Sequence, residues 1–375
     1  MSIGKEEREA VLRVVSTGIL SGYQGNWSEN FYGGLEVKAL EKEWSEYFGV
    51  KHSIFCNSAT SGLWAALNAI GMKPYIWNSK AKNYQPEIQE ILVTPFSMTC
   101  SASIPLVFGA NAVFVDIEED YFCMDPDKIE EKITQYTKAI IVVNLFGQPA
   151  DYDRINSIAK KHNLYVIEDN AQGTGAKYKG RYAGTLADIG IFSLNRHKHI
   201  NCGEGGVITT NDDELAMRLR LSCNHAEAVV NSERYSDEPF PVKCNFDNMV
   251  GMNLRGTELS AAIAREQLKK LDSILAVYQE NAKYFPVKVR SECTSAFYKY
   301  AWTDENFSKL DIESVKFLSK FNKDIPDDRF AFKHHYIDPI YKMPLFQTMG
   351  YEPGLCPVCE RVEENIVLVW FKEVV

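Results

Sequence analysis

The sequence predicts an α/β protein, with a large domain built on a mostly parallel sheet and a smaller α+β domain after it. Two observations lead to this prediction. Short β-branched runs alternate with helical patterns between about residues 50 and 210, and the chain beyond residue 270 is polar and mixed. Strand–helix alternation is typical of a parallel sheet covered by helices on both faces. Ligands bind such sheets beyond the carboxyl ends of the strands, so residues that follow a strand are the first candidates for a site.

Short apolar runs predict the strands, and amphipathic patterns between them predict helices. The strands are expected at Ile91–Thr94, Ala112–Val115, Ala139–Val143, Leu164–Ile167, Ile189–Ser193 and Val207–Thr210. Helices are expected at Pro126–Thr134 and Tyr152–His162. The stretch Lys73–Glu90 contains prolines and asparagines, which predict a surface insertion before the next strand.

A longer helical pattern follows Thr257, covers Glu258–Leu271 and is expected to continue beyond it. One face of this helix is mostly apolar, which predicts the side that it buries. That face consists of Leu259, Ile263, Gln267 and Leu271, with Ala262 beside them. We expect a large cofactor-binding domain at residues 20–250 and a small domain at residues 251–375 together with residues 1–19.

Composition and charge exclude several classes of protein. A hydrophobic content of 45% with 24% charged residues is typical of a folded globular chain. The net charge of −9 argues against nucleic acid as the main partner, because phosphate backbones attract a clustered basic surface. The N-terminal stretch MSIGKEEREAVLRVV has no apolar run long enough for a signal peptide or a membrane span, so we expect a cytoplasmic protein without membrane contact.

The cysteines predict neither disulfides nor a metal centre. Nine of them are scattered over 375 residues, which indicates buried or incidental thiols rather than a disulfide framework. Cys356 and Cys359 have the spacing of half a zinc site. A structural zinc site needs a second pair or suitably spaced histidines, which the neighbouring sequence lacks, so no metal is expected.

The first segment suited to chemistry is Cys56-Asn-Ser-Ala-Thr-Ser-Gly62, which opens a helical pattern. Several backbone N–H groups and the positive end of the helix dipole converge at such a helix start, which suits an anion such as phosphate. Capping of the helix by Asn57 or Ser58 is the simpler explanation of the same pattern.

The second segment is Val166-Ile-Glu-Asp-Asn-Ala-Gln172. Asp169 is expected just past the end of an apolar strand, where a carboxylate is costly to bury without a partner. The protonated ring nitrogen of a cofactor would be such a partner. A helix cap or a structural ion pair would explain Asp169 equally well.

The third segment follows the strand that ends at Ser193. Lys198 comes next in a polar loop, and the glycine-rich turn Gly203-Glu-Gly-Gly206 leads into another strand. Glycines there permit close approach of the backbone to a bound ring. The alternative for Lys198 is a solvated surface lysine, and the flanking His197 and His199 are weak evidence for a metal or a general base.

Together these segments resemble the sugar aminotransferases of the DegT/StrS type, which are fold-type I pyridoxal-phosphate enzymes. The resemblance extends over about residues 22–272 and includes the spacing between the matching blocks. These blocks are Asn57–Gly62, Gly109–Asp116, Phe146–Asp151, Glu168–Gln172, Ser193 with Lys198 five residues on, Gly203–Gly206 and Gly251–Glu258. The resemblance implies the fold of a fold-type I PLP-dependent transferase.

The resemblance also implies roles for individual residues. Lys198 would hold pyridoxal 5′-phosphate as a Schiff base and would move protons in catalysis. Asp169 would pair with the pyridine nitrogen, and Gln172 would lie near the ring's 3-oxygen. The phosphate would be held by the helix start and the end of the preceding strand, that is, by Ser58, Ala59, Thr60 and Ser193.

One matching block implies a homodimer with shared active sites. Asn253, with Arg255 beside it, would reach the phosphate of the cofactor in the partner subunit. The alternative is that both residues cap the helix that follows Thr257 and serve their own chain.

The sequence departs from the family at two places. Relatives usually carry an aromatic residue after the turn at Pro95 that stacks on the cofactor ring, whereas this chain reads Phe96-Ser-Met-Thr-Cys100 and is about one residue short. Either Met98 or Phe96 would then cover the ring. Relatives also usually continue beyond the position of Val375 with a further helix, so we expect an abbreviated small domain.

The resemblance implies that L-glutamate donates an amino group to a keto-sugar, usually nucleotide-linked, in surface polysaccharide or amino-sugar biosynthesis. A small phosphorylated ketone, such as a triose phosphate, is the alternative acceptor. A deoxysugar dehydratase is disfavoured because such relatives replace the Schiff-base lysine with histidine. A non-catalytic regulator that binds the cofactor is disfavoured by the intact Lys198, Asp169 and Ser193 and by the lack of a basic DNA-binding motif.

Acceptor specificity is expected in two loops. One is the stretch Tyr23–Gly34, and the other is Lys333–Tyr341, which contains His334, His335, Tyr336 and Tyr341. The side chains of these two loops do not identify a particular sugar.

Overall fold

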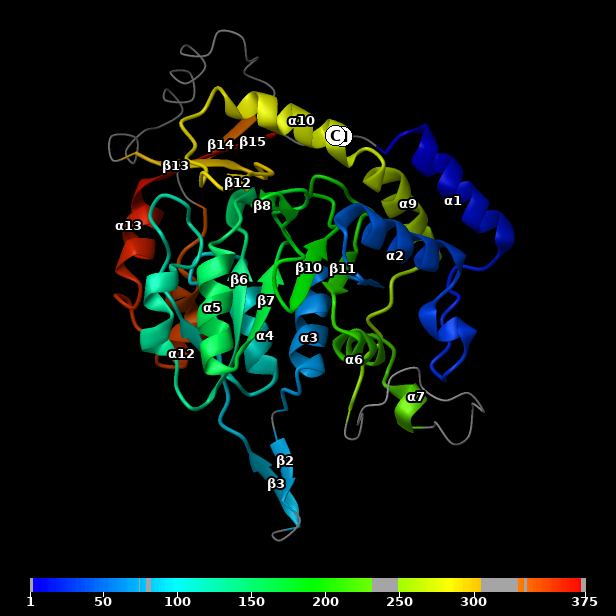
Figure 1. Cartoon of the computed structure of the whole chain (residues 1–375), viewed down its shortest axis with the longest axis horizontal. Coiled ribbons are helices and arrows are strands. Elements are labelled where there is room, and N and C mark those ends of the chain that lie inside the picture. The colour runs from blue at the N-terminus through cyan, green and yellow to red at the C-terminus, as the bar shows by residue number, and fades with distance from the viewer. Residues whose placement is uncertain are drawn as a thin grey trace.

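The central element of the protein is a seven-stranded sheet with the order β1-β11-β10-β7-β6-β4-β5 (Figure 1). The computed structural model describes residues 3–73, 75–78, 82–230, 249–304, 330–333 and 336–371. The strands are β1 (His52–Cys56), β4 (Glu90–Val93), β5 (Asn111–Phe114), β6 (Thr137–Val143), β7 (Tyr165–Asp169), β10 (Ile189–Ser193) and β11 (Gly206–Thr210). The predicted strands are thus confirmed, with ends displaced by at most two residues.

The sheet is mostly parallel, as predicted. Strands β5, β4, β6, β7 and β10 pair in parallel, whereas β11 is antiparallel to both β10 and β1. Strand β1 was not among the predicted strands, because its apolar run is short and begins with His52 and Ser53. Its carboxyl end leads directly into the helix start at Ser58.

Both faces of the sheet are buried. Along β6, Ala139, Ile141 and Val143 belong to one core cluster, and Ile140 and Val142 belong to the other. The first cluster includes residues of α3 (Ala59–Ala69), α4 (Cys100–Val107) and α6 (Asp213–Cys223). The second includes residues of α2 (Leu35–Phe48), α5 (Tyr152–His162) and α9 (Glu258–Leu268). A strand that is covered by helices on both faces of the sheet needs apolar residues at every position, and β6 has them from Ala139 to Val143.

The prediction of an α-helix at Pro126–Thr134 is wrong in the type of helix. The structure has two 3-10 turns there, η2 (Pro126–Lys128) and η3 (Glu130–Lys132). The backbone becomes extended at Ile133, so the segment ends without forming an α-helical turn. By contrast, α5 has the bounds that the sequence predicts.

The long helix expected at Glu258–Leu271 is two helices, α9 and α10 (Leu271–Ala282). The predicted buried face is also wrong in part, because Leu259 and Ile263 are only half-buried. Helix α9 packs against both α1 (Lys5–Thr17) and α2, so it buries two sides rather than one. The sides are made of the small residues Ala261, Ala262 and Ala264 together with Leu268.

The predicted insertion contains a hairpin of β2 (Tyr75–Asn78) and β3 (Asn83–Pro86), which projects away from the main sheet (Figure 1). A second small sheet joins β12 (Cys293–Thr294), β8 (Lys177–Tyr178) and β9 (Arg181–Tyr182). The remaining elements are η1 (Glu29–Tyr32), η4 (Leu145–Gly147), α7 (Glu227–Val230), η5 (Ile340–Lys342), α12 (Pro344–Thr348) and α13 (Pro357–Asn365).

The C-terminal part of the chain adds an antiparallel sheet of β13 (Tyr300–Thr303), β15 (Ile366–Phe371) and β14 (Phe330–Lys333). Tyr300, Trp302, Val367 and Val369 of this sheet form a separate core cluster with Tyr278 of α10. A mixed α+β arrangement is present here, and the exact domain boundaries stay a prediction.

Cys356 and Cys359 are buried at the start of α13. The backbone N–H groups of Val358 and Cys359 each donate to the Asp116 carboxylate over 2.9 Å, so this turn has a structural role. Within the described ranges, no three or more His, Cys, Asp or Glu side chains gather in a way that could hold a metal ion. None of the helices in those ranges is both long and apolar enough to span a bilayer.

Candidate active site

A cavity of about 430 Å³ lies at the carboxyl ends of β6, β7 and β10. It brings together all but one of the residues that the sequence predicts for the site. These are Ser58, Ala59, Thr60, Met98, Asp169, Gln172, Ser193 and Lys198. Asn253 does not line it. Further lining residues include Cys100, Asn195, His197, Glu204, Tyr298, Lys299 and Tyr336.

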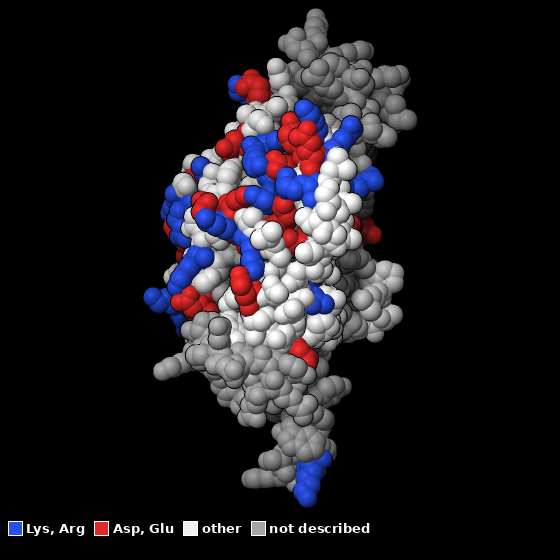
Figure 2. Space-filling view, turned by 90° about the vertical axis from the view of Figure 1, so that its right-hand side faces the viewer, with Lys and Arg blue, Asp and Glu red and all other residues white. Residues whose placement is uncertain are grey.

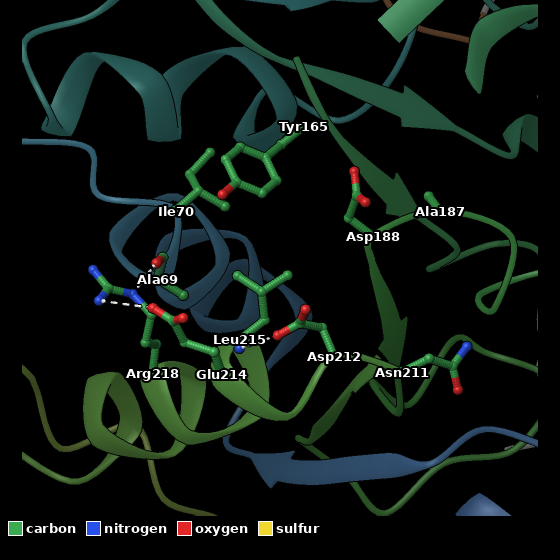
Figure 3. Close-up of a pocket in the computed structure, with 10 residues that line it drawn as sticks. All are labelled: Ala69, Ile70, Tyr165, Ala187, Asp188, Asn211, Asp212, Glu214, Leu215 and Arg218. Atoms are coloured by element: carbon green, nitrogen blue, oxygen red, sulfur yellow. Dashed lines mark hydrogen bonds and ion pairs between the residues drawn. The ribbon is translucent and has the colours of Figure 1, made fainter. Parts of the chain in front are cut away.

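A second cavity, of about 590 Å³, lies at the amino ends of β7 and β10 and beside the carboxyl end of β11 (Figure 3). Its polar side chains maintain the fold. Asp188 accepts a hydrogen bond from the N–H of Val166 at 2.7 Å, and Asp212 caps α6. The Arg218 guanidinium donates to the Ala69 carbonyl at the end of α3 (Figure 3). The cavity at the carboxyl ends is therefore the better candidate for chemistry.

The start of α3 forms one wall of the candidate site. Ser58 is the N-cap, and its Oγ accepts a hydrogen bond from the N–H of Ser61 at 3.1 Å, so the capping hypothesis holds for this residue. Capping by Ser58 occupies only the third N–H of the helix. The N–H groups of Ala59 and Thr60 belong to the first turn, which has no intrahelical acceptors, and they are suited to an anion.

Gly206 allows β11 to lie directly against this helix start. A Cβ at position 206 would be 2.5 Å from the carbonyl carbon of Ser58 and 2.7 Å from the nitrogen of Ala59. At Gly206 the close backbone approach is to the start of α3, and the predicted approach of this turn to a bound ring stays a prediction. Ser193, at the end of β10, accepts a hydrogen bond from the N–H of Asn195 at 3.3 Å, which fixes the start of the loop.

Asp169 is the last residue of β7 rather than the residue after it. Its carboxylate is buried, accepts from the N–H of Ala171 at 3.1 Å and from the Ser101 hydroxyl at 3.3 Å, and faces the cavity. Burial raises the pKa of this carboxyl group, and the positive charge of Lys198 opposes the rise. A cationic group in the cavity would therefore stabilise the ionised form.

Lys198 lies in the cavity and is only partly exposed, so the alternative of a solvated surface lysine does not hold. Its Nζ is 4.5 Å from the centre of the Tyr298 ring. Burial lowers the pKa of this amine to about 8, although Asp169 and Cys100 favour the charged form. An amine with a pKa near neutrality can act as both nucleophile and base.

Gln172 is held in one orientation by two partners. Its Oε1 accepts from the N–H of Phe146 at 2.9 Å, and its Nε2 donates to the Tyr336 hydroxyl at 3.0 Å. The Tyr336 ring packs edge-on against Phe96 and Phe146. The amide has a second N–H that remains available to a group in the cavity.

The structure distinguishes between the two candidates for covering a cofactor ring. Met98 lines the cavity, and 55% of its surface is exposed. Phe96 is fully buried, with ring centres 5.5 Å from Tyr336 and 6.3 Å from Phe146. Of the two side chains, only Met98 reaches the space where a ring would lie.

Asn253 and Arg255 lie outside this cavity and interact with each other. Arg255 donates to Asn253 Oδ1 at 2.9 Å and to Asn224 Oδ1 at 3.2 Å. Neither residue caps α9, because Thr257 does so by accepting from the N–H of Ser260. The suggestion that Asn253 and Arg255 are helix caps is therefore wrong.

The predicted specificity loops have different positions. Tyr23 lies beside Arg255, and Asn224 donates to the carbonyl of Gln24, so the Tyr23–Gly34 loop adjoins the Asn253 cluster. Tyr336 lines the cavity. Tyr341 is buried and donates to Glu360 at 2.7 Å, which makes it a core residue. His334 and His335 lie outside the described residues.

Sequence reasoning missed two residues of the cavity wall, Tyr298 and Lys299. They follow Lys198 by about a hundred residues and precede β13, where no local pattern marks them as part of a site. His199 is buried, and its Nε2 is 2.8 Å from the carbonyl oxygen of Ala296. His199 therefore links the Lys198 loop to this wall, whereas His197 lines the cavity.

The donors and acceptors of the cavity fit pyridoxal phosphate. The start of α3 and Ser193 offer N–H and hydroxyl groups for a phosphate, and buried Asp169 offers a carboxylate for a protonated ring nitrogen. The lowered pKa of Lys198 suits an amine that must react with an aldehyde.

Comparison with known proteins agrees with this geometry. The model of the DegT/DnrJ/EryC1/StrS aminotransferase family matches residues 17–371. A GDP-perosamine synthase from Caulobacter vibrioides is 36% identical over 76% of this chain and 67% of its own length. A GDP-4-keto-6-deoxy-D-mannose 3-dehydratase from Yersinia pseudotuberculosis is 34% identical over 69% of this chain and 65% of its own. The crystal structure of an aminotransferase from Psychrobacter cryohalolentis superposes with a TM-score of 0.78, at 27% identity over 98% of this chain and 91% of that one.

Proposed function

The chain belongs to the DegT/DnrJ/EryC1/StrS aminotransferase family, and on this premise we propose that it transfers the amino group of L-glutamate to a nucleotide-linked keto-sugar. The observation that carries the proposal is the convergence of Lys198, with its lowered pKa, and buried Asp169 on one cavity. The similarity to a GDP-perosamine synthase supports a sugar acceptor and a role in polysaccharide or amino-sugar biosynthesis. The cytoplasmic location stays a prediction.

Each residue of the cavity has a separate role in the proposed reaction. Bound pyridoxal phosphate supplies an electron sink that weakens the bonds at the Cα of an attached amino acid. The Lys198 amine takes the proton from the donor Cα and returns a proton when the acceptor is aminated. Asp169 would hold the proton on the ring nitrogen, and the start of α3 with Ser193 would hold the phosphate. Met98, which lines the cavity, would lie over the ring.

The two half-reactions test this proposal separately. The holoenzyme with L-glutamate alone should release 2-oxoglutarate in an amount equal to the cofactor, with loss of the visible cofactor absorbance. A nucleotide-linked keto-sugar should then restore that absorbance. Restoration by phosphoketones and by no keto-sugar would refute the sugar acceptor. Loss of a sugar hydroxyl without amination would identify a dehydratase instead.

The pKa of Lys198 sets the pH dependence of cofactor capture. The reaction of apoprotein with pyridoxal phosphate requires the neutral amine, so its rate should rise with pH through about 8 and then level off. An unshifted lysine would give a rate that rises until about pH 10.4. Stopped-flow absorbance between pH 6.5 and 10 distinguishes the two profiles, and a midpoint above 9.5 would contradict the burial of Lys198.

We propose further that the protein is a homodimer with shared active sites. Helix α1, the segment after it and the start of α2 expose apolar side chains, among them Leu12 at 64%, Ile19 at 59% and Leu35 at 83% exposure. The face that carries α1 combines interspersed charges with uncharged strips (Figure 2). An exposed apolar patch rimmed by polar groups is typical of an interface between chains. Asn253 lies outside its own chain's cavity, as expected if it serves the partner's site.

Mixing of inactive variants tests the shared site. Lys198→Ala and Asn253→Ala subunits should each be inactive, whereas a mixed dimer would contain one site with both defects and one with neither. Activity should return to as much as half per mixed dimer. The readout is glutamate-dependent amination after subunit exchange, followed with differently tagged subunits. No recovery despite demonstrated exchange would mean that Asn253 does not serve the partner's cofactor.

A further inference from the structure

A buried polar network lies beside the cavity, at the carboxyl ends of β6 and β7. Successive side chains of a strand point to opposite faces of the sheet, so Glu168 lies on the face of β7 opposite to Asp169. Asn170, directly after β7, and Asn144, directly after β6, belong to the same network. Glu168, Asn170 and Asn144 are each fully buried, at 0% exposure. Polar side chains buried to this extent need hydrogen-bond partners.

Asn144 is the centre of this network and uses all four hydrogen-bonding positions of its amide. Its Nδ2 donates to Glu168 Oε1 and to Asn170 Oδ1, each at 2.8 Å. Its Oδ1 accepts from the N–H of Ala150 at 3.2 Å and from the Tyr152 hydroxyl at 3.0 Å. A backbone N–H can only donate, so the contact with Ala150 fixes which end of the amide carries the oxygen.

The other two side chains attach the end of β7 to the segment before β10. Glu168 Oε2 accepts from the N–H of Leu186 at 2.9 Å, and Asn170 Nδ2 donates to the carbonyl of Ala183 at 2.9 Å. Burial raises the pKa of the Glu168 carboxyl group, and the hydrogen bonds that it accepts oppose the rise. Loss of the Asn144 amide would therefore leave buried acceptors on both residues without their shared donor.

The network reaches Asp169 through the backbone. The residues before and after Asp169 are Glu168 and Asn170, and the Asp169 carbonyl accepts from the N–H of Asn144 at 3.0 Å. The N–H of Asn170 donates to the carbonyl of Ile191 at 2.8 Å. The backbone of Asp169 is thus held on both sides, and this holds its carboxylate in the cavity.

Asn144 also precedes the turn that orients Gln172. Phe146, two residues after Asn144, has a positive φ of 56°, and its N–H donates to Gln172 Oε1 at 2.9 Å. A Cβ at Gly173 would collide with Asn170 Oδ1 and lie 3.1 Å from Asn144 Cβ. Glycine at this position therefore lets the chain after Gln172 lie directly against the network.

We infer that Asn144 is a positioning residue for the proposed reaction, which holds Asp169 opposite the ring nitrogen of the cofactor. This inference rests on the proposed function. Asn144 does not line the cavity, so it acts through Asp169 rather than on the cofactor. A displacement of about 1 Å caused by a residue away from the chemistry can reduce a rate about 100-fold.

The test compares the binding of pyridoxal phosphate to apoprotein with that of its 1-deaza analogue, in which a C–H replaces the ring nitrogen. Only pyridoxal phosphate can use the Asp169 carboxylate, so the ratio of the two dissociation constants reports this contact. Wild-type protein should prefer pyridoxal phosphate. Asn144→Ala should reduce the preference at least about fivefold, the lower limit for a buried group that loses its hydrogen-bond partner.

A double-variant cycle provides a kinetic readout. In Asn144→Ala, kcat/KM of the first half-reaction with L-glutamate should fall between about 5- and 150-fold. In the Asp169→Asn background the same change should alter the rate less than about twofold, because the residue that Asn144 positions no longer carries a charge. A loss that comes only from a weakened fold would be the same in both backgrounds.

Asn68 provides a matched control. It is a buried asparagine at 7% exposure, its Nδ2 donates to Ser222 Oγ at 2.7 Å and to the Val250 carbonyl at 2.8 Å, and it does not line the cavity. Asn68→Ala removes comparable buried hydrogen bonds elsewhere. This variant should keep the wild-type cofactor preference and the wild-type rate within about twofold.

Two results would overturn the inference. Equal weakening of both cofactors in Asn144→Ala, or an undiminished loss of rate in the Asp169→Asn background, would show that Asn144 only supports the fold. If Asn144→Ala does not fold, Tyr152→Phe removes one donor to Asn144 Oδ1 and provides the same comparison. Wild-type protein that binds both cofactors equally would refute the role of Asp169 in the proposed function, which is a different result from a failure confined to the Asn144 variant.

Discussion

Replacing Lys198 with alanine is expected to reduce transamination by more than about four orders of magnitude while the fold is retained. General acid–base catalysis alone accounts for about 10²–10⁴ in rate, and this variant also loses the nucleophile that exchanges the cofactor between enzyme and substrate. The residues proposed to bind the phosphate, Ser58, Ala59, Thr60 and Ser193, are untouched, so cofactor should still associate. The measurement is single-turnover release of 2-oxoglutarate from L-glutamate.

Lys177→Ala is the control for this experiment, because that lysine lies outside the cavity. It should have wild-type activity. Thermal melting should be similar for both variants, which separates a chemical loss from a folding defect. Activity of Lys198→Ala within about a hundredfold of wild type would exclude Lys198 as the proton carrier.

Replacing Asp169 with asparagine is expected to reduce turnover by about 10²- to 10⁴-fold. Removing one partner of a buried charged pair costs about 3–5 kcal/mol, and each 1.36 kcal/mol is a factor of ten. The neutral amide cannot hold a proton on the ring nitrogen, so the cofactor withdraws electrons from Cα less well. The measurement is the rate of the first half-reaction together with cofactor affinity.

Ser101 supplies the control for Asp169. Its hydroxyl is a neighbour of the carboxylate at 3.3 Å, and Ser101→Ala leaves the charge in place. The loss in this variant should be at most about 10²-fold and smaller than that of Asp169→Asn, since a hydrogen bond to a charged group contributes about 1.5–3 kcal/mol. Near-normal turnover of Asp169→Asn would make this residue a structural group that positions Ala171.

The fold and the centre of the site were accessible from sequence because their signals are local. Each predicted strand is a continuous apolar run, as a doubly covered parallel sheet requires, and Asp169 and Ser193 end two of those strands. Parallel strands bring their carboxyl ends to one edge, so residues far apart in sequence could be placed together. The family resemblance supplied the roles that these positions do not reveal alone.

The errors arise where tertiary packing overrides local pattern. Helix α9 buries alanines on two sides because α1 and α2 flank it, and this cannot be deduced from the periodicity of one helix. Tyr298 and Lys299 reach the cavity only because Gly147 lets their segment approach the turn after β6. Phe96 turns into the core while Met98 remains at the cavity, a choice that depends on Tyr336 and Phe146.

Reductive labelling tests the central claim most directly. Treatment of holoenzyme with borohydride should fix the cofactor covalently to the protein, and peptide mapping should locate it on Lys198 in stoichiometric amount. Lys198 is the lysine of the cavity that we expect to react, because burial lowers the pKa of its amine to about 8 and because it interacts with the Asp169 charge and the Tyr298 ring. Labelling of Lys299 or of any other lysine, or no covalent label with cofactor demonstrably bound, would contradict the account.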